Sequence, residues 1–212
     1  MGSDSPIAFI KQSIRDFRTT GAVAPSSAFL ARGIASNLPS EMPADFQVLE
    51  VGPGTGSITA ELVKRMNGRG HLDLFEISPD FCSVLRRRIA EEKLYNAMRQ
   101  NIQIHEGDVR SLKRQNYYDA VVSGLPFSCF QPDEVRGFIE HFRYLLKPGG
   151  ALIWFEYVGI RELQSPFVGK KRREQLKGIN AVMSSFIREH QYRQQIIPLN
   201  LPPARIRHLR FG

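Results

Sequence analysis

The chain has 212 residues, of which 42% are hydrophobic, and this suits one globular α/β domain with a sizeable core. Its longest apolar stretches, such as residues 151–155, are far shorter than the ~20 residues that a membrane-spanning helix needs. No signal segment opens the sequence, so we expect a cytoplasmic protein. Cys82 and Cys129 lack metal-ligand spacing, which predicts two reduced thiols and no metal site.

The positive charge of the chain is concentrated in its last quarter. Residues 1–160 contain 18 basic and 18 acidic residues, whereas residues 161–212 contain 11 basic and 3 acidic residues. The whole formal charge of +8 therefore lies after residue 160. Such asymmetry predicts an anionic partner, which is either nucleic acid or an acidic membrane surface.

The first 45 residues predict two helices before the first strand. Residues 6–18 place Ile7, Ile10, Ile14 and Phe17 on one apolar stripe with basic residues beside it. The stripe alone favours packing on the core over a position in a membrane interface. Small residues form a loop at 20–27, a second helix is expected at about 27–36, and residues 38–45 lead into the first strand.

Residues 48–58, V-L-E-V-G-P-G-T-G-S-I, predict a strand, a glycine turn and the start of a helix. Backbone without side chains approaches a ligand closely, and free N–H groups at a helix start point toward it. A dinucleotide-binding turn needs G-x-G-x-x-G, but Ser57 stands in place of its third glycine. A P-loop needs Gly-Lys-Ser/Thr, and no lysine precedes Lys64. What remains is Glu-x-Gly-x-Gly-x-Gly, which begins at Glu50.

Further strands follow at regular spacing. Residues 71–76 predict a second strand ending in Glu76, whose carboxylate can accept both hydroxyls of a ribose. Residues 102–104 predict a third strand, which is followed by Asp108 and Val109. Residues 119–123 predict a fourth strand that ends at Ser123, and residues 145–153 a helix end, a turn and a fifth strand. Helices are expected at 79–92 and 132–146, and the three arginines at 86–88 are interpreted as solvated surface.

The chain becomes basic after the fifth strand. Residues 161–177 predict an irregular insertion that contains K-K-R-R at 170–173. Residues 179–189 predict a helix, and residues 192–198 and 205–211 predict a closing hairpin.

With these features in order, the chain resembles the class I S-adenosylmethionine-dependent methyltransferases. The resemblance implies a Rossmann-like α/β fold: a seven-stranded, mostly parallel sheet with helices on both faces, a C-terminal antiparallel hairpin and an N-terminal amphipathic helix. It divides the chain into a helical extension, residues 1–45, and a methyltransferase domain, residues 46–212. It implies S-adenosylmethionine as cofactor, with Glu50 facing the methionine amino group, Glu76 the ribose and Asp108 the adenine. The implied cofactor-binding residues are Glu50, Gly52, Pro53, Gly54, Thr55, Gly56, Glu76, Ile77, Asp108, Val109 and Ser123.

Most of the chain also resembles the bacterial phospholipid N-methyltransferases, relatives of the ribosomal RNA adenine dimethyltransferases. The shared segments are the opening helix, G-A-V-A-P-S-S at 21–27, L-E-V-G-P-G-T-G at 49–56, S-G-L-P-F at 123–127 and N-L-P-P-A at 200–204. This likeness implies an aminolipid substrate, either phosphatidylethanolamine, its methylated intermediates or an ornithine lipid. It also implies that the opening helix lies in the membrane interface and that the protein associates peripherally with the inner face of the membrane.

The turn at 123–127 bears on the acceptor. Enzymes that methylate an exocyclic base amine carry Asn-x-Pro-Tyr/Phe there, and Gly124 stands in place of the asparagine. The residues expected at the acceptor are Gly124, Leu125, Phe127, Glu156 and Tyr157. Backbone carbonyls of Gly124 and Leu125 would orient the amine, and the rings of Phe127 and Tyr157 would face its charge. Glu156 would accept a proton or tether a nearby arginine.

Two alternatives remain open from the sequence. The positive tail also suits an adenine N-methyltransferase that acts on RNA, although Gly124 argues against it. A non-enzymatic membrane-binding module with a vestigial fold is disfavoured because every expected cofactor position is filled. A monomer or a weak oligomer is expected in either case.

Overall fold

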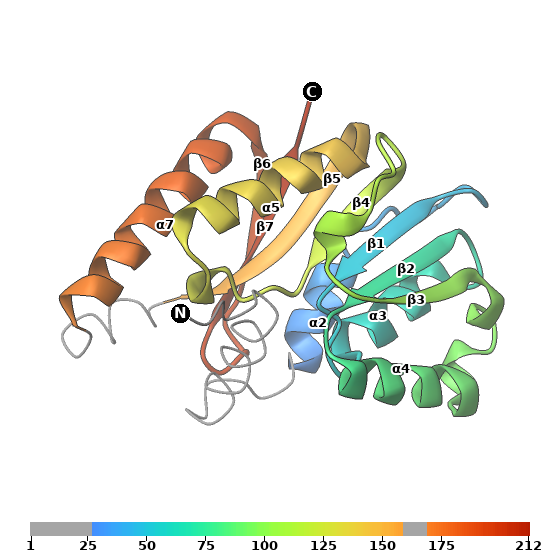
Figure 1. Ribbon diagram of the computed structural model, residues 1–212. Coiled ribbons are helices and arrows are strands. Elements are labelled where there is room, and N and C mark those ends of the chain that lie inside the picture. The colour runs from blue at the N-terminus through green and yellow to red at the C-terminus, as the bar shows by residue number, and fades with distance from the viewer. Residues whose placement is uncertain (1–26, 159–168) are drawn as a thin grey trace.

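The computed structural model describes residues 27–158 and 169–212, which form a seven-stranded sheet with helices on both faces (Figure 1). The strands are β1 (Gln47–Val51), β2 (His71–Glu76), β3 (Ile102–Glu106), β4 (Tyr118–Ser123), β5 (Leu146–Tyr157), β6 (Gln191–Ile197) and β7 (Ala204–Arg210). Their order is β3-β2-β1-β4-β5-β7-β6. The first five strands are parallel, and β7 is antiparallel to both β5 and β6. The predicted fold class is confirmed, and the opening helix predicted at 6–18 lies outside the described residues.

The central strands are buried on both faces, as their nearly continuous apolar sequences predict. The second strand has the predicted bounds, and the fourth begins one residue earlier than expected. β3 is two residues longer than predicted because its pairing with β2 continues to Glu76 and Glu106. β5 runs on to Tyr157 because β7 pairs with it from Ala151 to Tyr157.

Helices α2 (Ala28–Ala35), α3 (Ser57–Met66) and α4 (Pro79–Glu91) lie on one face of the sheet, and α5 (Pro132–Leu145) and α7 (Lys170–His190) on the other (Figure 1). Short 3-10 helices are η1 (Lys93–Tyr95), η2 (Arg99–Asn101), η3 (Val109–Ser111) and η4 (Phe127–Cys129). Within residues 27–158 and 169–212, no helix combines the length and the apolar character needed to cross a membrane.

The prediction of an irregular segment through residue 177 is wrong for residues 170–177, because α7 already begins at Lys170. Four basic residues at a helix start oppose the helix dipole, so the sequence alone disfavours a helix there. Tertiary contacts hold this end in place: Arg172 donates a hydrogen bond to the Ser128 carbonyl (2.8 Å), and Gln175 donates one to the Phe130 carbonyl (2.6 Å). The basic run 170–173 is therefore the first turn of a helix.

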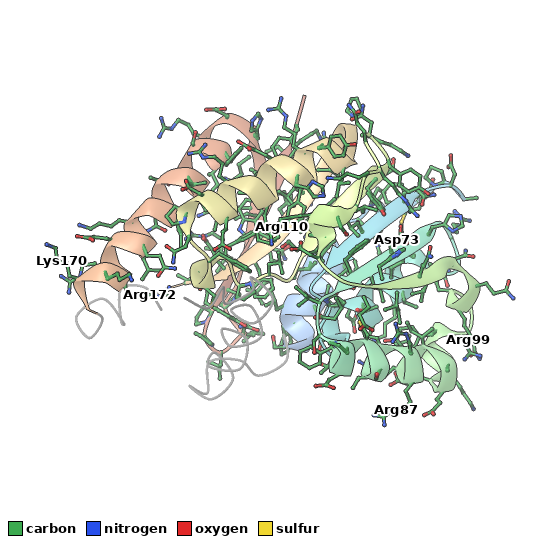
Figure 2. The ribbon with its side chains drawn as sticks, in the orientation of Figure 1. Asp73, Arg87, Arg99, Arg110, Lys170 and Arg172 are labelled. Carbon is green, nitrogen blue, oxygen red and sulfur yellow. The ribbon has the colours of Figure 1, made fainter. Side chains whose placement is uncertain are left out.

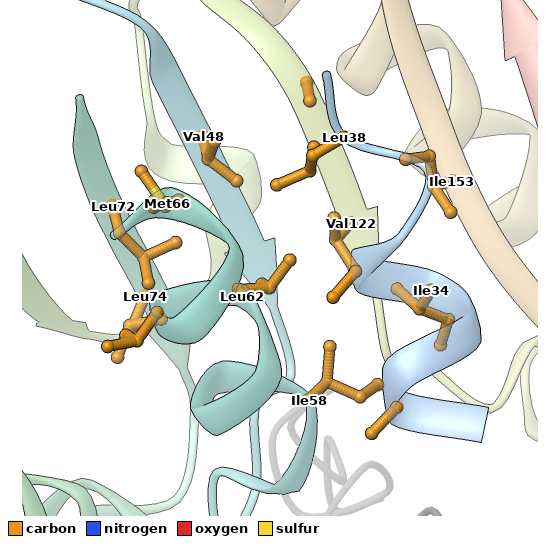
Figure 3. Close-up of a cluster of buried hydrophobic side chains, with 14 of the residues drawn as sticks. Ile34, Leu38, Val48, Ile58, Leu62, Met66, Leu72, Leu74, Val122 and Ile153 are labelled. Atoms are coloured by element: carbon orange, nitrogen blue, oxygen red, sulfur yellow. The ribbon is translucent and has the colours of Figure 1, made fainter. Parts of the chain in front are cut away.

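Each face of the sheet carries its own apolar cluster. On the first face, α2 and α3 pack on the central strands through Ile34, Leu62 and neighbouring side chains (Figure 3). On the second face, α5 and α7 cover β4, β5 and β7. Trp154 of β5 is fully buried in this cluster. Because α2 contributes to the first cluster, the end of the predicted helical extension shares the core of the sheet.

The hairpin of β6 and β7 returns the chain to the edge at which β1–β5 end, which we call the carboxyl edge. Tyr157, near the end of β5, pairs with Ala204, the first residue of β7, so the turn 198–203 lies at this edge. The Val158 amide donates a hydrogen bond to the Pro203 carbonyl (2.7 Å). Ser27 caps α2 and donates its hydroxyl hydrogen bond to the Asn200 side chain. The turn is thereby fixed to both β5 and α2.

Candidate active site

The glycine turn has the backbone that its sequence predicts. Gly52, Gly54 and Gly56 have φ values of 71°, 58° and 83°, which L-residues with side chains rarely adopt. The Gly56 amide donates to the Pro53 carbonyl (2.9 Å), and α3 begins at the next residue. A Cβ atom on Gly54 would meet no described atom within 4 Å. The turn therefore presents bare backbone toward open space at Gly54.

Glu50 lies under this turn as a buried carboxylate. Its side chain is fully buried in β1, and neither carboxylate oxygen has a hydrogen-bond partner among the described residues. Burial raises the pKa of Glu50 to about 8, and the polar groups of nearby Thr59, whose hydroxyl is not in hydrogen-bond geometry, offset this rise only in part. An unpaired buried acid is costly, so this position is suited to a cationic ligand group.

Glu76, at the end of β2, connects two turns. Its carboxylate accepts hydrogen bonds from the Gly54 amide (3.0 Å) and from the Ser78 amide (2.9 Å). Burial raises the pKa of Glu76, and the hydrogen bonds from Ser78, Gly54 and Ile77 work against that rise. The structure thus brings Glu50, Glu76 and the glycine turn together, as the sequence predicted.

Arg88 is a functional candidate that the sequence analysis missed. Arg86 and Arg87 are exposed as predicted, but Arg88 donates a hydrogen bond to the Thr55 carbonyl in the glycine turn. Its guanidinium also pairs with Glu92 (2.7 Å), one helical turn further on. The sequence holds no signal that singles it out, because Arg87 and Glu91 have the same four-residue spacing as Arg88 and Glu92. This arginine links α4 to the glycine turn.

Asp108 lies after β3, near the carboxyl edge, and is engaged with Arg110. The carboxylate accepts from the Arg110 amide (2.9 Å) and forms a bidentate pair with its guanidinium. Partial burial raises the pKa of Asp108, but the Arg110 hydrogen bonds outweigh it and give a net decrease. The Arg110 guanidinium lies 4.8 Å from the centre of the Phe138 ring on α5. Val109 is buried beside Asp108, and its packing on an adenine ring stays a prediction.

Gly124 lies directly against the glycine turn. Its amide donates to the Val51 carbonyl (2.8 Å), and a Cβ atom on Gly124 would stand 2.6 Å from the Gly52 carbonyl oxygen. An asparagine would therefore displace the cofactor turn. Ser123, which is buried, accepts a hydrogen bond from the Leu125 amide (3.3 Å). The close packing of the two turns therefore leaves no room for an asparagine side chain at position 124.

The other expected acceptor residues do not share one surface. Phe127 is buried in the cluster under α5, whereas Tyr157 packs with the cluster on the opposite face. Burial raises the pKa of Tyr157. Glu156 accepts hydrogen bonds from Arg207 (2.8 Å) and pairs with Arg205 (3.5 Å), both on β7. The structure therefore shows the tethering contact for Glu156, and proton acceptance stays a prediction.

The residues at the carboxyl edge fit S-adenosylmethionine. The unpartnered Glu50 carboxylate suits an ammonium group, the bare turn admits close approach, and Glu76 offers a carboxylate for two hydroxyls. Asp108 lies just after β3 and forms an ion pair with Arg110, so an adenine amino group would have to share or replace that ion pair.

Comparisons with known proteins show similarity to methyltransferases. Residues 48–150 match the sequence profile of a family described as a methyltransferase domain. An ornithine lipid N-methyltransferase from Singulisphaera acidiphila is 32% identical over 148 residues, which cover 67% of this chain and 72% of that enzyme. A putative S-adenosyl-L-methionine-dependent methyltransferase structure from Methanococcus maripaludis has a TM-score of 0.59 at 17% identity, covering 99% of this chain and 96% of that one. An O-methyltransferase from Bacillus cereus in complex with SAH has a TM-score of 0.60 at 13% identity, covering 96% and 91%.

Proposed function

The chain belongs to the class I S-adenosylmethionine-dependent methyltransferases, with S-adenosylmethionine as its cofactor, and from that premise we propose that it methylates the amine headgroup of a membrane aminolipid. The substrate is phosphatidylethanolamine, one of its methylated intermediates or an ornithine lipid. The observation that carries this proposal is the contact of Gly124 with the Gly52 carbonyl, which leaves no room for an amide that would hold a planar base amine. The similarity to an ornithine lipid N-methyltransferase supports the same acceptor class.

Each acid at the carboxyl edge has a proposed role in holding the cofactor. When bound, S-adenosylmethionine supplies a methyl group activated by its sulfonium centre. Glu50 pairs with the methionine ammonium, and Glu76 exchanges the hydrogen bond that it accepts from the Gly54 amide for hydrogen bonds from the ribose hydroxyls. Asp108 and Val109 hold the adenine, once Arg110 yields part of its contact with Asp108.

The acceptor amine must arrive with a free lone pair, because an ammonium cannot attack a methyl carbon. The turn after β4 orients it through backbone carbonyls at Gly124 and Leu125. Leu125 retains acceptor capacity, since its carbonyl receives one hydrogen bond from the Phe127 amide (2.9 Å) and has two lone pairs. The Tyr157 ring is available for cation–π contact with the methylated product, whereas the Phe127 ring supports the turn from the core.

The proposed site of action is the inner face of an anionic membrane, to which the chain binds peripherally. The excess of basic residues after residue 160 supports attraction to acidic lipid, at about 1 kcal/mol per cation near the surface. Lys170 and Lys171 are exposed at the start of α7, which points toward the carboxyl edge (Figure 2). A substrate embedded in lipid would therefore meet the site from that edge.

The alternative acceptor is an adenine in RNA, which the same basic residues favour. The decisive experiment offers the purified chain labelled S-adenosylmethionine with three acceptors in parallel: vesicles containing ornithine lipid, vesicles containing phosphatidylethanolamine, and unmodified ribosomal RNA. We expect label in the lipid phase of at least one vesicle sample. Label in RNA alone would overturn the aminolipid proposal in favour of the alternative.

A further inference from the structure

Large apolar side chains are exposed around the turn between β6 and β7. The exposed fractions are 49% for Phe29, 54% for Ile196, 67% for Leu199 and 87% for Leu201. We call these four residues the apolar tip. Phe29 belongs to the first turn of α2, which the Ser27 contact with Asn200 fixes beside the hairpin. Such a concentration on one edge of a small domain marks an interaction surface.

Hydrogen bonds of Asn200 fix the turn that carries Leu199 and Leu201. Asn200 is buried, and its side chain accepts from the Ser27 hydroxyl and donates to the Pro202 carbonyl. The Asn200 amide donates to the Ile197 carbonyl (3.3 Å). Both the oxygen and the nitrogen of the Asn200 side-chain amide are hydrogen-bonded inside the protein, whereas the flanking Leu199 and Leu201 side chains are exposed to solvent. Their exposure is therefore built into the turn.

A groove of about 360 Å³ adjoins the tip and continues its apolar surface. It is lined by Phe29, Arg32, Gly33, Ser36, Gln195, Ile197, Pro198 and Leu199. Gly33 lies close to the hairpin, because a Cβ atom on it would stand 2.9 Å from the terminal methyl groups of Ile197 and Ile206. Arg32 is exposed at this groove, with its guanidinium 6.0 Å from the centre of the Phe29 ring. A cation beside aliphatic and aromatic groups suits the boundary between phosphates and acyl chains.

The tip shares an edge with the cofactor residues. The turn 198–203 and the end of β5 meet at the carboxyl edge, where β1 and β2 also present Glu50 and Glu76 (Figure 1). The basic start of α7 is at the same edge, because Arg172 contacts Ser128 just after β4 (Figure 2). One edge therefore combines cations, protruding leucines and the methyl-transfer site.

We propose that the apolar tip inserts into the headgroup boundary of an anionic lipid surface and so presents the carboxyl edge to lipid amines. The proposal rests on the aminolipid function and names the element that makes the membrane contact. Lipid is favoured over nucleic acid because aliphatic side chains gain nothing from a phosphate backbone but are stabilised when acyl chains replace water around them. The nearby cations complement the negative leaflet.

The test compares three full-length proteins: wild type, the double variant Leu199→Ser/Leu201→Ser, and the control Tyr144→Ser. Tyr144 is also an exposed apolar side chain, but it ends α5 just before β5 begins, at the opposite edge of the sheet. Each protein is sedimented with phosphatidylcholine vesicles that contain phosphatidylglycerol, and calorimetry with S-adenosylhomocysteine verifies folding. We expect the double variant to partition on the order of tenfold more weakly than wild type. The control should partition like wild type.

The failure of this proposal is separable from failure of the function. Wild-type turnover on a short-chain phosphatidylethanolamine dispersed as monomers tests the aminolipid reaction without a membrane, and the double variant should keep that turnover. If no aminolipid is methylated, the function is wrong while the vesicle data still decide the docking.

Three results would overturn the docking itself. Equal partitioning of wild type and double variant would do so directly. If the two proteins partition equally and ultracentrifugation shows a dimer for wild type but a monomer for the double variant, the tip is a contact between two copies of the chain. Equal partitioning with faster proteolysis within residues 1–26 would make that segment its partner.

Discussion

Replacing the ionisable carboxyl of Glu50 should abolish a proton release that accompanies cofactor binding. The Glu50 carboxyl is fully buried without a described partner, and burial raises its pKa to about 8. At pH 7, about nine in ten molecules without ligand then carry a proton there. An ammonium group placed beside the carboxylate lowers such a pKa by about 1 to 3 units. Between about 0.4 and 0.9 proton should therefore be released at pH 7 for each ligand bound.

The assay is calorimetric titration with S-adenosylhomocysteine in phosphate and in Tris at pH 7. The two buffers differ in ionisation enthalpy, so the difference in measured heat gives the number of protons released. The Glu50→Gln variant keeps the volume of the side chain but cannot ionise, so its release should fall toward zero. Its affinity should also weaken by about 1.5 to 3 kcal/mol, because a charge-assisted contact is lost.

The same group links stability to pH in a definite direction. Because the folded pKa is raised from 4.5 to about 8, the folded state binds the proton more tightly, and stability falls as pH rises through that window. The shift corresponds to up to about 5 kcal/mol between pH 4.5 and 8. Denaturant titrations without ligand should show this fall in wild type and a flatter profile in Glu50→Gln. Equal proton release in the two proteins, or parallel stability profiles, would refute the reasoning.

Three further predictions concern other residues. Gly124→Asn should weaken cofactor binding at least as strongly as it reduces turnover, since the new side chain meets the Gly52 carbonyl; unchanged calorimetric affinity would contradict the packing argument. His208 is buried with both ring nitrogens unpartnered among the described residues, and burial lowers its pKa to about 4; the unfolded state therefore binds the proton between pH 6.5 and 4. The free energy of unfolding should fall by up to about 3 kcal/mol as pH drops through that window, and His208→Leu should remove this fall. Denaturation profiles that depend on pH in the same way in wild type and His208→Leu would contradict the prediction. Arg88→Met should weaken cofactor binding by about tenfold through loss of the hydrogen bond to Thr55, while Arg87→Met, at an exposed position, should not; equal effects would remove the role given to Arg88.

Much of the fold was predictable because its signals are local. The strand ending in Glu76 was predicted to the residue, since a buried parallel strand is an apolar run bounded by turn residues. The glycine turn was predictable because Gly52, Gly54 and Gly56 carry backbone angles that other residues disfavour. Glu50 and Glu76 were found together because parallel strands end at one edge.

The parts that were missed depend on contacts between distant segments. The start of α7 is stabilised by contacts of Arg172 and Gln175 with the loop after β4, which no local propensity reports. Arg88 looks like its two arginine neighbours in sequence and differs from them only in reaching the Thr55 carbonyl. Whether Phe127 faces the site or the core is likewise decided by the packing of α5.

The direction of β7 has a practical consequence for handling the protein. Because β7 starts at the carboxyl edge and runs antiparallel to β5, the last residue, Gly212, is at the far end of the sheet from the turn 198–203 (Figure 1). A tag or fluorescent fusion after Gly212 would extend away from the leucines and the acids alike. Attachment to a sensor chip through that end would leave the opposite edge facing the flowing sample, where vesicles could reach it.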